Sequence, residues 1–115
     1  MMDNIIETKS FDFAVRIVKM CRYLAEEKKE HVLSKQLLRS GTSIGANVAE
    51  AERGQSRADF VAKMTIALKE ANETYYWLRL IYKTGLINEK AFRSMENEIK
   101  EIISILTAIC KTAGK

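Results

Sequence analysis

The chain has 115 residues, of which 47% are hydrophobic and 30% charged, and it contains no proline. This length fits one domain, and the lack of proline favours long helices over a loop-rich or all-β fold, which would use proline in its turns. The formal net charge of +4 permits anionic partners without establishing them. The first residues lack the pattern of a secretory signal. No apolar run approaches the roughly 18 residues of a membrane span, so we expect a cytoplasmic protein.

The first expected helix covers residues 10–28, with Ser10 as its N-terminal cap. Apolar residues recur along it at spacings of three and four, in two parallel stripes. The stripes are Phe11, Ala14, Val18, Cys21 and Ala25, and Phe13, Ile17, Met20 and Leu24. A helix with one solvated side needs only one apolar stripe. The second stripe therefore predicts that this helix also contacts something outside its own bundle.

The second expected helix covers residues 34–53 and begins with Ser34 as its cap. Its expected buried face consists of Leu37, Ile44, Val48 and Ala51. On one side of this helix Gly41, Gly45 and Ala49 recur every four residues. Small residues at this spacing let another backbone approach closely.

The third expected helix covers residues 57–84, with Ser56 as its cap and Gly85 just after its end. Its apolar residues alternate at spacings of four and three over three heptads, which predicts coiled-coil-like packing. They are Phe60, Met64, Ala67, Ala71, Thr74, Leu78 and Ile81. The fourth expected helix covers residues 89–112 and follows Asn88 as its cap.

These four amphipathic helices have short connections, and no segment shows the alternation of a β-strand. The sequence therefore predicts an all-α fold, an antiparallel up-down-up-down four-helix bundle. It contains no internal repeat, linker or low-complexity tract. We expect residues 1–115 to form a single domain.

Two patterns suggest chemistry, and the context supports neither. Residues 41–45 read G-x-S-x-G, like the nucleophile elbow of α/β-hydrolases, but that elbow needs a preceding strand and a later acid and His. Here the flanks are helical, and the single His, His31, precedes the serine. Cys21 and Cys110 lie far apart, and one His cannot complete a zinc site. We predict no catalytic, metal-binding or cofactor-binding residues.

A polar set on the second helix consists of Asn47, Glu50 and Arg53. Glu70 and Glu73 form a pair on the third helix, its antiparallel neighbour, so the two sets are expected to approach each other. We interpret them as a network of hydrogen bonds and ion pairs that fixes the register of the helices. The alternative is a carboxylate metal site, but bundle metalloproteins use Glu-x-x-His motifs, and no such motif is present.

Candidate phosphate-binding residues lie on the first three helices. They are Arg16, Lys19, Arg39, Arg53, Arg57 and Lys63. Because Glu52 and Asp59 are interleaved with them, an ordinary solvated face remains an alternative. Trp77 and its tyrosine neighbours could stack on bases, although aromatic residues in a heptad helix more often anchor a core or an interface.

The middle of the chain contains the pattern Ser-Ile-x-x-Asn-x-Ala-Glu over residues 43–50. With its flanking residues it resembles a bacterial family of small four-helix-bundle proteins encoded in intervening sequences of 23S rRNA genes. The flanking matches are Gln36-Leu37, Ser40, Arg53, Ser56, Phe60, Ala67-Leu68, Asn72-Glu73, Leu78 and Gly85-Leu86-Ile87. The chain departs from the family pattern at Ala51, where Gly is usual, and at Lys69-Glu70, where Gly-Ser or similar is usual.

The resemblance implies an antiparallel four-helix bundle that assembles into a ring-forming homopentamer. A related group, the accessory variability determinant of diversity-generating retroelements, is a basic pentameric barrel that binds nucleic acid and a reverse transcriptase. We therefore predict a non-enzymatic homo-oligomer that binds structured RNA, or DNA, through a basic surface, with no membrane or small-molecule substrate. The alternative is a structural or scaffolding module that recognises a protein partner and has no nucleic-acid role.

Overall fold

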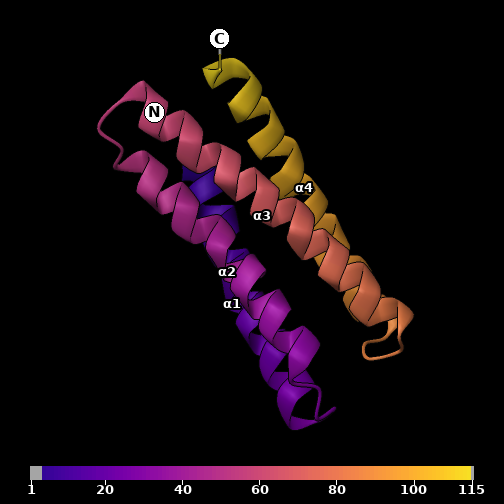
Figure 1. Ribbon diagram of the computed structural model, residues 1–115. Helices are drawn as coiled ribbons and strands as arrows, with labels where there is room; N and C mark the ends of the chain where they lie inside the picture. The colour runs from indigo at the N-terminus through magenta and orange to yellow at the C-terminus, as the bar shows by residue number, and fades with distance from the viewer. Residues whose placement is uncertain (1–3, 115) are drawn as a thin grey trace.

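The computed structural model describes residues 4–114, which form four helices joined by three short turns (Figure 1). The helices are α1 (Asn4–Glu26), α2 (Val32–Glu52), α3 (Arg57–Lys83) and α4 (Glu89–Ala113). Residues 4–114 contain no strand. The predicted all-α four-helix bundle is confirmed.

Contacts between distant residues show that neighbouring helices run antiparallel. Arg39, in the first half of α2, pairs with Glu73, in the second half of α3. Glu50, near the end of α2, pairs with Lys63, near the start of α3. Contacts of α1 with α2, of α3 with α4 and of α1 with α4 follow the same inverse order. The α1–α2 and α3–α4 turns therefore lie at one end of the bundle, in the lower half of Figure 1.

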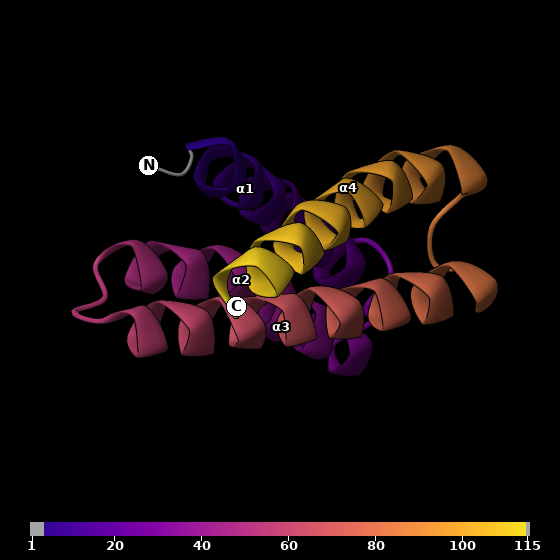
Figure 2. The same cartoon turned by 90° about the horizontal axis from the view of Figure 1, so that it is seen from above.

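The helix pairs differ in how closely they pack. Figure 2 shows α1 and α4 lying over the α2–α3 pair. The α2–α3 pair makes the most contacts and the α1–α4 pair the fewest. The α1–α4 side is therefore the most open side of the bundle.

Two of the predicted helix starts are wrong. Helix α1 begins at Asn4, and Ser10 lies inside it, buried, with its hydroxyl donating to the carbonyl of Glu7. Helix α2 begins at Val32, and Ser34 is likewise a buried residue of the helix interior. A serine can cap a helix or, because it is small, occupy a position where two helices approach closely. Both of these serines take the second role.

The cap of α2 differs from the prediction, whereas the caps of α3 and α4 and the glycine after α3 agree with it. The Glu30 carboxylate replaces the expected serine cap at the start of α2, where it accepts from the backbone N–H of Leu33 at 2.7 Å. The side chain of Ser56 accepts from the backbone N–H of Asp59, and that of Asn88 caps α4 in the same way. Gly85 has a φ of +84°, a conformation that glycine adopts without a steric penalty.

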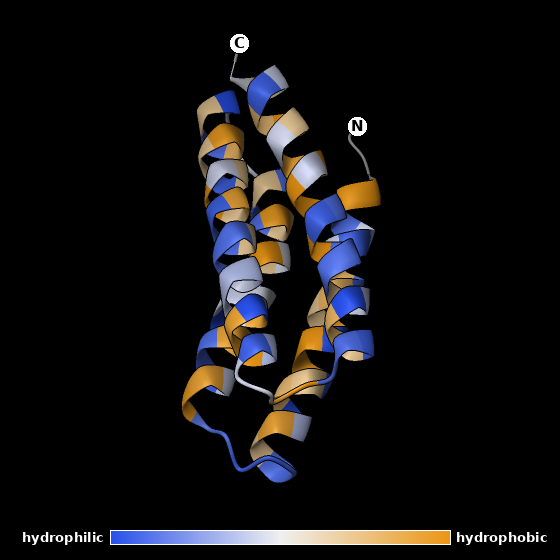
Figure 3. Ribbon diagram, turned by 90° about the vertical axis from the view of Figure 1, so that its right-hand side faces the viewer, coloured by the Kyte–Doolittle hydropathy of each residue, from blue (hydrophilic) through white to orange (hydrophobic). Residues whose placement is uncertain are grey.

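Each helix contributes apolar residues to one buried core. In Figure 3 hydrophobic and hydrophilic colours alternate along the helices. All of the expected heptad residues of α3 are buried except Phe60, which is partly buried. The expected buried face of α2 is confirmed as well. The largest fully buried side chains are Phe13, Ile6, Ile17, Leu24, Leu37, Ile44, Met64, Leu78, Ile81, Met95, Ile99 and Ile102.

The small residues of α2 mark the close approach of α1. A Cβ atom added to Gly41 would lie 2.8 Å from a side-chain atom of Ile17. A Cβ atom added to Gly45 would lie 3.3 Å from the carbonyl oxygen of Ser10. The predicted close packing on this side of α2 is thus confirmed, and its partner is α1.

The two apolar stripes of α1 have different environments. Phe13, Ile17 and Leu24 of the second stripe are buried in the core, as is Cys21 of the first stripe, whereas Phe11 of the first stripe is 67% exposed. Val15, which belongs to neither stripe, is 40% exposed. Val18 lies beside the exposed Leu38 of α2 in a shallow groove between the two helices. We call the exposed residues Phe11, Val15 and Leu38, together with the partly buried Val18, the apolar strip.

Candidate nucleic-acid interface

Four of the six predicted phosphate-binding residues are engaged by partners within the chain. Arg16 on α1 contacts Ser94 and Glu98 on α4, each at 2.9 Å. Lys63 pairs with Glu50 at 2.7 Å. Arg39 pairs with carboxylates of α3, and Arg57 donates to the carbonyl of Ala113. Binding a phosphate through these side chains would compete with existing contacts.

The other two predicted residues, Arg53 and Lys19, are less constrained. The guanidinium of Arg53 donates to the carbonyl of Ala49, at 3.5 Å, and makes no ion pair with the described residues. Lys19 makes no ion pair with any described residue. The six residues therefore lie on three helices in different environments.

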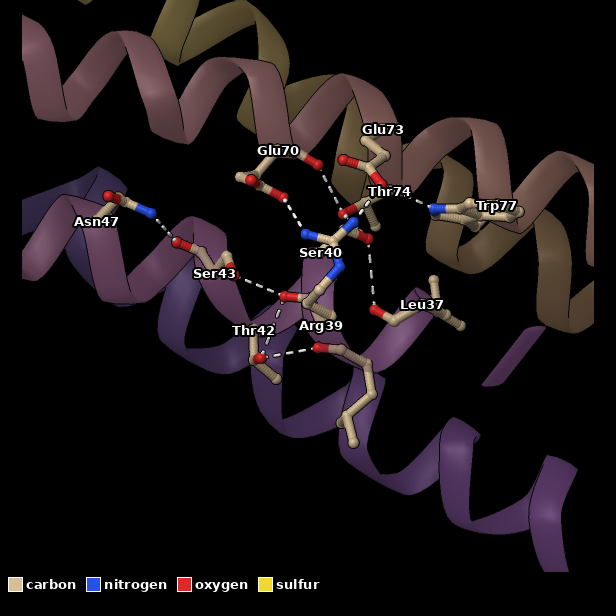
Figure 4. A network of polar contacts seen from close by, with 11 residues as sticks. Leu37, Arg39, Ser40, Thr42, Ser43, Asn47, Glu70, Glu73, Thr74 and Trp77 are labelled. Carbon is tan, nitrogen blue, oxygen red and sulfur yellow. Dashed lines mark hydrogen bonds and ion pairs between the residues drawn. The ribbon is translucent and has the colours of Figure 1, made fainter. Parts of the chain in front are cut away.

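Arg39 is the centre of a polar cluster between α2 and α3 (Figure 4). Its guanidinium donates to Glu73 and to Glu70, the latter at 3.5 Å. The indole N–H of Trp77 also donates to Glu73, at 3.2 Å. Arg39 therefore joins the two helices, and Trp77 is held by the same carboxylate.

A buried hydrogen bond lies beneath this cluster. The hydroxyl of Thr74 donates to the hydroxyl of Ser40 at 3.0 Å, and both residues are fully buried. Because two buried hydroxyls must face each other, this contact helps to fix the register of α2 against α3.

The expected polar network exists in a different form. The side-chain amide of Asn47 donates to the carbonyl of Ser43 within α2, at 2.8 Å. Glu50 pairs with Lys63, which holds the pKa of the Glu50 carboxyl below its usual range. The carboxylates of α3 pair with Arg39. The contacts that join α2 to α3 thus involve two residues that the sequence had suggested for phosphate binding.

Charge is concentrated at the end of the bundle that holds the α1–α2 and α3–α4 turns. We call this region, residues 19–35 and 79–93, the basic end. It contains nine Lys and Arg residues against four Glu, a net charge of +5, while the rest of the chain has ten cationic and eleven acidic residues. The cationic residues are Lys19, Arg22, Lys28, Lys29, Lys35, Arg79, Lys83, Lys90 and Arg93. Most of them were not among the predicted binding residues.

Aromatic rings lie among these cations. The rings of Tyr82 and Phe92 stack with their centroids 4.4 Å apart. The guanidinium of Arg93 lies 5.1 Å from the Phe92 centroid, and that of Arg79 lies 5.7 Å from the ring of Tyr75. Such contacts keep cationic side chains extended over apolar surfaces. Arg93 also pairs with Glu96 and Glu89, whereas Arg79 makes no ion pair with the described residues.

Glu96 is the one buried carboxylate among the described residues, and it joins α3 to α4. It accepts from the hydroxyl of Tyr75 at 2.5 Å and from Arg93 at 2.8 Å, and Lys100 lies 3.6 Å away. The hydrogen bond from Tyr75 is the main cause that holds the pKa of Glu96 below its usual range, and the hydrogen bond from Arg93 is the next. The same carboxylate raises the pKa of Tyr75. This cluster satisfies its own charges and is best explained as structural.

A cavity of about 520 Å³ lies between α1 and α4 at the basic end. We call it the α1–α4 cavity. Its lining residues are Arg16, Lys19, Met20, Tyr23, Ile87, Asn88, Ala91 and Met95. Volumes of this order are typical of sites that hold a small organic group.

The described residues provide little for other chemistry. Among residues 4–114, no group of three or more His, Cys, Asp or Glu side chains could hold a metal ion. Burial raises the pKa of the Cys21 thiol to about 11, so this thiol is not an activated nucleophile. None of the four helices is long and apolar enough to cross a membrane.

Comparison with known proteins identifies the family. The family described as 23S rRNA-intervening sequence protein matches residues 2–108. No curated protein matches the chain significantly. One similar solved structure is the crystal structure of a protein with unknown function from the S23 ribosomal protein family of Bacteroides thetaiotaomicron VPI-5482. It is 55% identical and superposes with a TM-score of 0.93, over 96% of this chain and 99% of that chain. This chain therefore belongs to the 23S rRNA-intervening sequence protein family.

Proposed function

We propose that this protein is a non-enzymatic, homo-oligomeric bundle that binds structured RNA through phosphates at its basic end. The observation that carries the proposal is the segregation of charge, with +5 at one end and −1 over the rest of the chain. The family description, which refers to 23S rRNA, is compatible with an RNA partner. The resemblance to a nucleic-acid-binding accessory protein supports the same proposal.

The cations of the basic end differ from those of the helix interfaces in their availability. Lys19, Lys83 and Lys90 make no ion pair with any residue in the described part of the chain. A cation without a carboxylate partner can bind a phosphate and release a condensed counterion without first breaking an internal contact. We therefore assign RNA binding to the basic end and not to Arg16, Arg39 and Lys63.

The proposal is tested by titrating a structured RNA hairpin with the protein at several salt concentrations. We expect binding that weakens steeply with salt, with a slope of log K against log salt of about −3 to −5, as four to six phosphate contacts would give. Fluorescence anisotropy of a labelled hairpin measures it. The proposal is wrong if no complex forms at about 50 mM salt, or if affinity does not depend on salt.

We further propose that a second copy of the chain covers the apolar strip. Phe11 is the most exposed aromatic residue of the described chain, and Val15 and Leu38 extend the apolar surface on both helices of the α1–α2 pair. Contiguous exposed apolar side chains of this kind mark interaction surfaces.

Light scattering after gel filtration should give a mass several times 13.1 kDa for the unmodified chain. Phe11→Glu should lower this mass, because it places a charge in the buried interface. Tyr76→Glu is the matched control, since Tyr76 is also an exposed aromatic residue but lies on α3. A monomer at micromolar concentration, or equal effects of the two substitutions, would contradict the assignment.

The apolar strip also favours a second candidate function, a scaffolding module that recognises another protein. In that case the chain itself would be monomeric, and the strip would remain open for the partner. A pull-down that returns one protein, survives nuclease treatment and is lost in Phe11→Glu would support this function. Retention of that protein by Phe11→Glu, or its loss on nuclease treatment, would argue against it.

A further inference from the structure

The α1–α4 cavity adjoins the apolar strip along α1 and extends from it toward α4. At 100° per residue, Tyr23 of the cavity lies about 120 to 140° around α1 from Phe11 and Val18, whereas Lys19 follows Val15 by one turn on the same face. A second copy bound to the strip would therefore border the cavity on its Lys19 side, next to Val15. The cavity opens within the basic end, between residues of its two charged segments.

The lining of the cavity has three kinds of surface. Its apolar part includes Met20, Ile87 and Met95, and methionine side chains adapt to flat or irregular ligands. Tyr23, which is 43% exposed, adds an aromatic face. The ammonium group of Lys19 supplies a positive charge that no described carboxylate neutralises.

Asn88 adds a polar group at the start of α4. Its side-chain oxygen is occupied as the helix cap, where it accepts from the backbone N–H of Ala91 at 2.8 Å. The amide nitrogen of the same side chain makes no hydrogen bond with the described residues, so it can donate to a ligand. The cavity thus combines an apolar floor, one hydrogen-bond donor and one free cation.

We propose that the α1–α4 cavity binds the base of an unpaired RNA nucleotide, with Lys19 on the phosphate of that nucleotide. This inference rests on the proposed RNA binding and deepens it. A base has flat apolar faces that suit Met20 and Tyr23, and polar edges that suit the amide of Asn88. Its phosphate would lie among the other cations of the basic end, which can bind neighbouring phosphates. A base inside a paired stem is stacked and cannot enter, so the protein should prefer RNA with an extrahelical nucleotide.

The test compares three RNA hairpins that share one stem. The first is fully paired, the second has a single bulged adenosine, and the third has an abasic residue in the same bulge. Anisotropy at one salt concentration should show the adenosine bulge binding about fivefold or more tighter than the paired stem, because a stacked base contributes this much. The abasic bulge should bind like the paired stem.

The third hairpin separates the base from the shape of the bulge. If the abasic and adenosine bulges bind equally well, the protein recognises a bent backbone and the inference is wrong. If all three hairpins bind equally well, the inference also fails, while RNA binding through phosphates stands. If none binds, the proposed function itself fails.

A cavity-filling substitution links the preference to this site. Ala91→Met places a longer side chain in the cavity and should reduce the adenosine preference, measured against the paired stem with the same variant, to less than about twofold. Ala108→Met is the matched control, an exposed position on the same helix outside the cavity. Tyr23→Ala, which removes the aromatic face, should have the same effect as Ala91→Met. Full adenosine preference in both Ala91→Met and Tyr23→Ala would overturn the assignment to this cavity.

Discussion

Replacing Gly41 with valine should lower the free energy of unfolding by about 2 to 3 kcal/mol. Even the first carbon of a side chain at this position would lie 2.8 to 3.0 Å from three side-chain atoms of Ile17. Ile17 is fully buried and branched at Cβ, so it cannot rotate away cheaply. Valine has a better helix propensity than glycine, but this advantage is below about 1 kcal/mol and does not offset the clash.

Urea denaturation followed by circular dichroism measures the effect. Ala46→Val is the matched control, because Ala46 is exposed on the same helix and its substitution should change stability by less than about 0.5 kcal/mol. A double-mutant cycle with Gly41→Ala and Ile17→Val tests the contact itself. Because valine is smaller than isoleucine, Ile17→Val should relieve part of the clash, and Gly41→Ala should be less destabilising in its presence. If Gly41→Val is no more destabilising than Ala46→Val, α1 and α2 do not approach as closely as described.

Removing two cations from the basic end should weaken RNA binding about tenfold or more and make the salt slope shallower by about 1.5. The variant is Lys83→Gln with Lys90→Gln, one substitution on α3 and one on α4. Neither side chain has an ion-pair partner among the described residues, so their loss should leave the fold intact. Affinity should fall for all RNA sequences alike, because phosphate contacts carry no sequence information.

The matched control for this variant is Lys69→Gln with Lys111→Gln. It removes the same charge from the same two helices, again from side chains without a described ion-pair partner, but outside the basic end. The control should change affinity by less than about threefold through the weaker long-range field. Equal losses in the two variants would show that overall charge determines binding, and the basic end would lose its special role.

Much of the fold could be predicted because periodicity alone determines which face of each helix is buried. The heptad residues of α3 and the apolar face of α2 are cases where pattern and structure agree. The helix starts were harder, because Ser10 and Ser34 have the chemistry of a cap and the size of a close-packing residue. Local sequence does not distinguish these two uses. Which of the two roles a serine takes depends on whether a neighbouring helix packs closely against it.

The candidate site was harder to predict for a similar reason. Arg39 and Lys63 resemble phosphate-binding residues in sequence, but antiparallel pairing places each of them opposite a carboxylate. Counting outward from the α2–α3 turn would have revealed both pairs. The basic end depends on topology even more strongly, since its two segments are about 60 residues apart in sequence and join only when the bundle folds.

The charge asymmetry of a single bundle has a consequence for any closed ring. In a cyclic assembly every copy has the same orientation relative to the symmetry axis. If the bundles stand roughly along that axis, all basic ends appear on one face, and the opposite face carries little net charge. Such a ring would have two distinct sides, with a circle of positive potential on one of them. An RNA attracted to that circle would contact several copies at once, so weak individual contacts would act together.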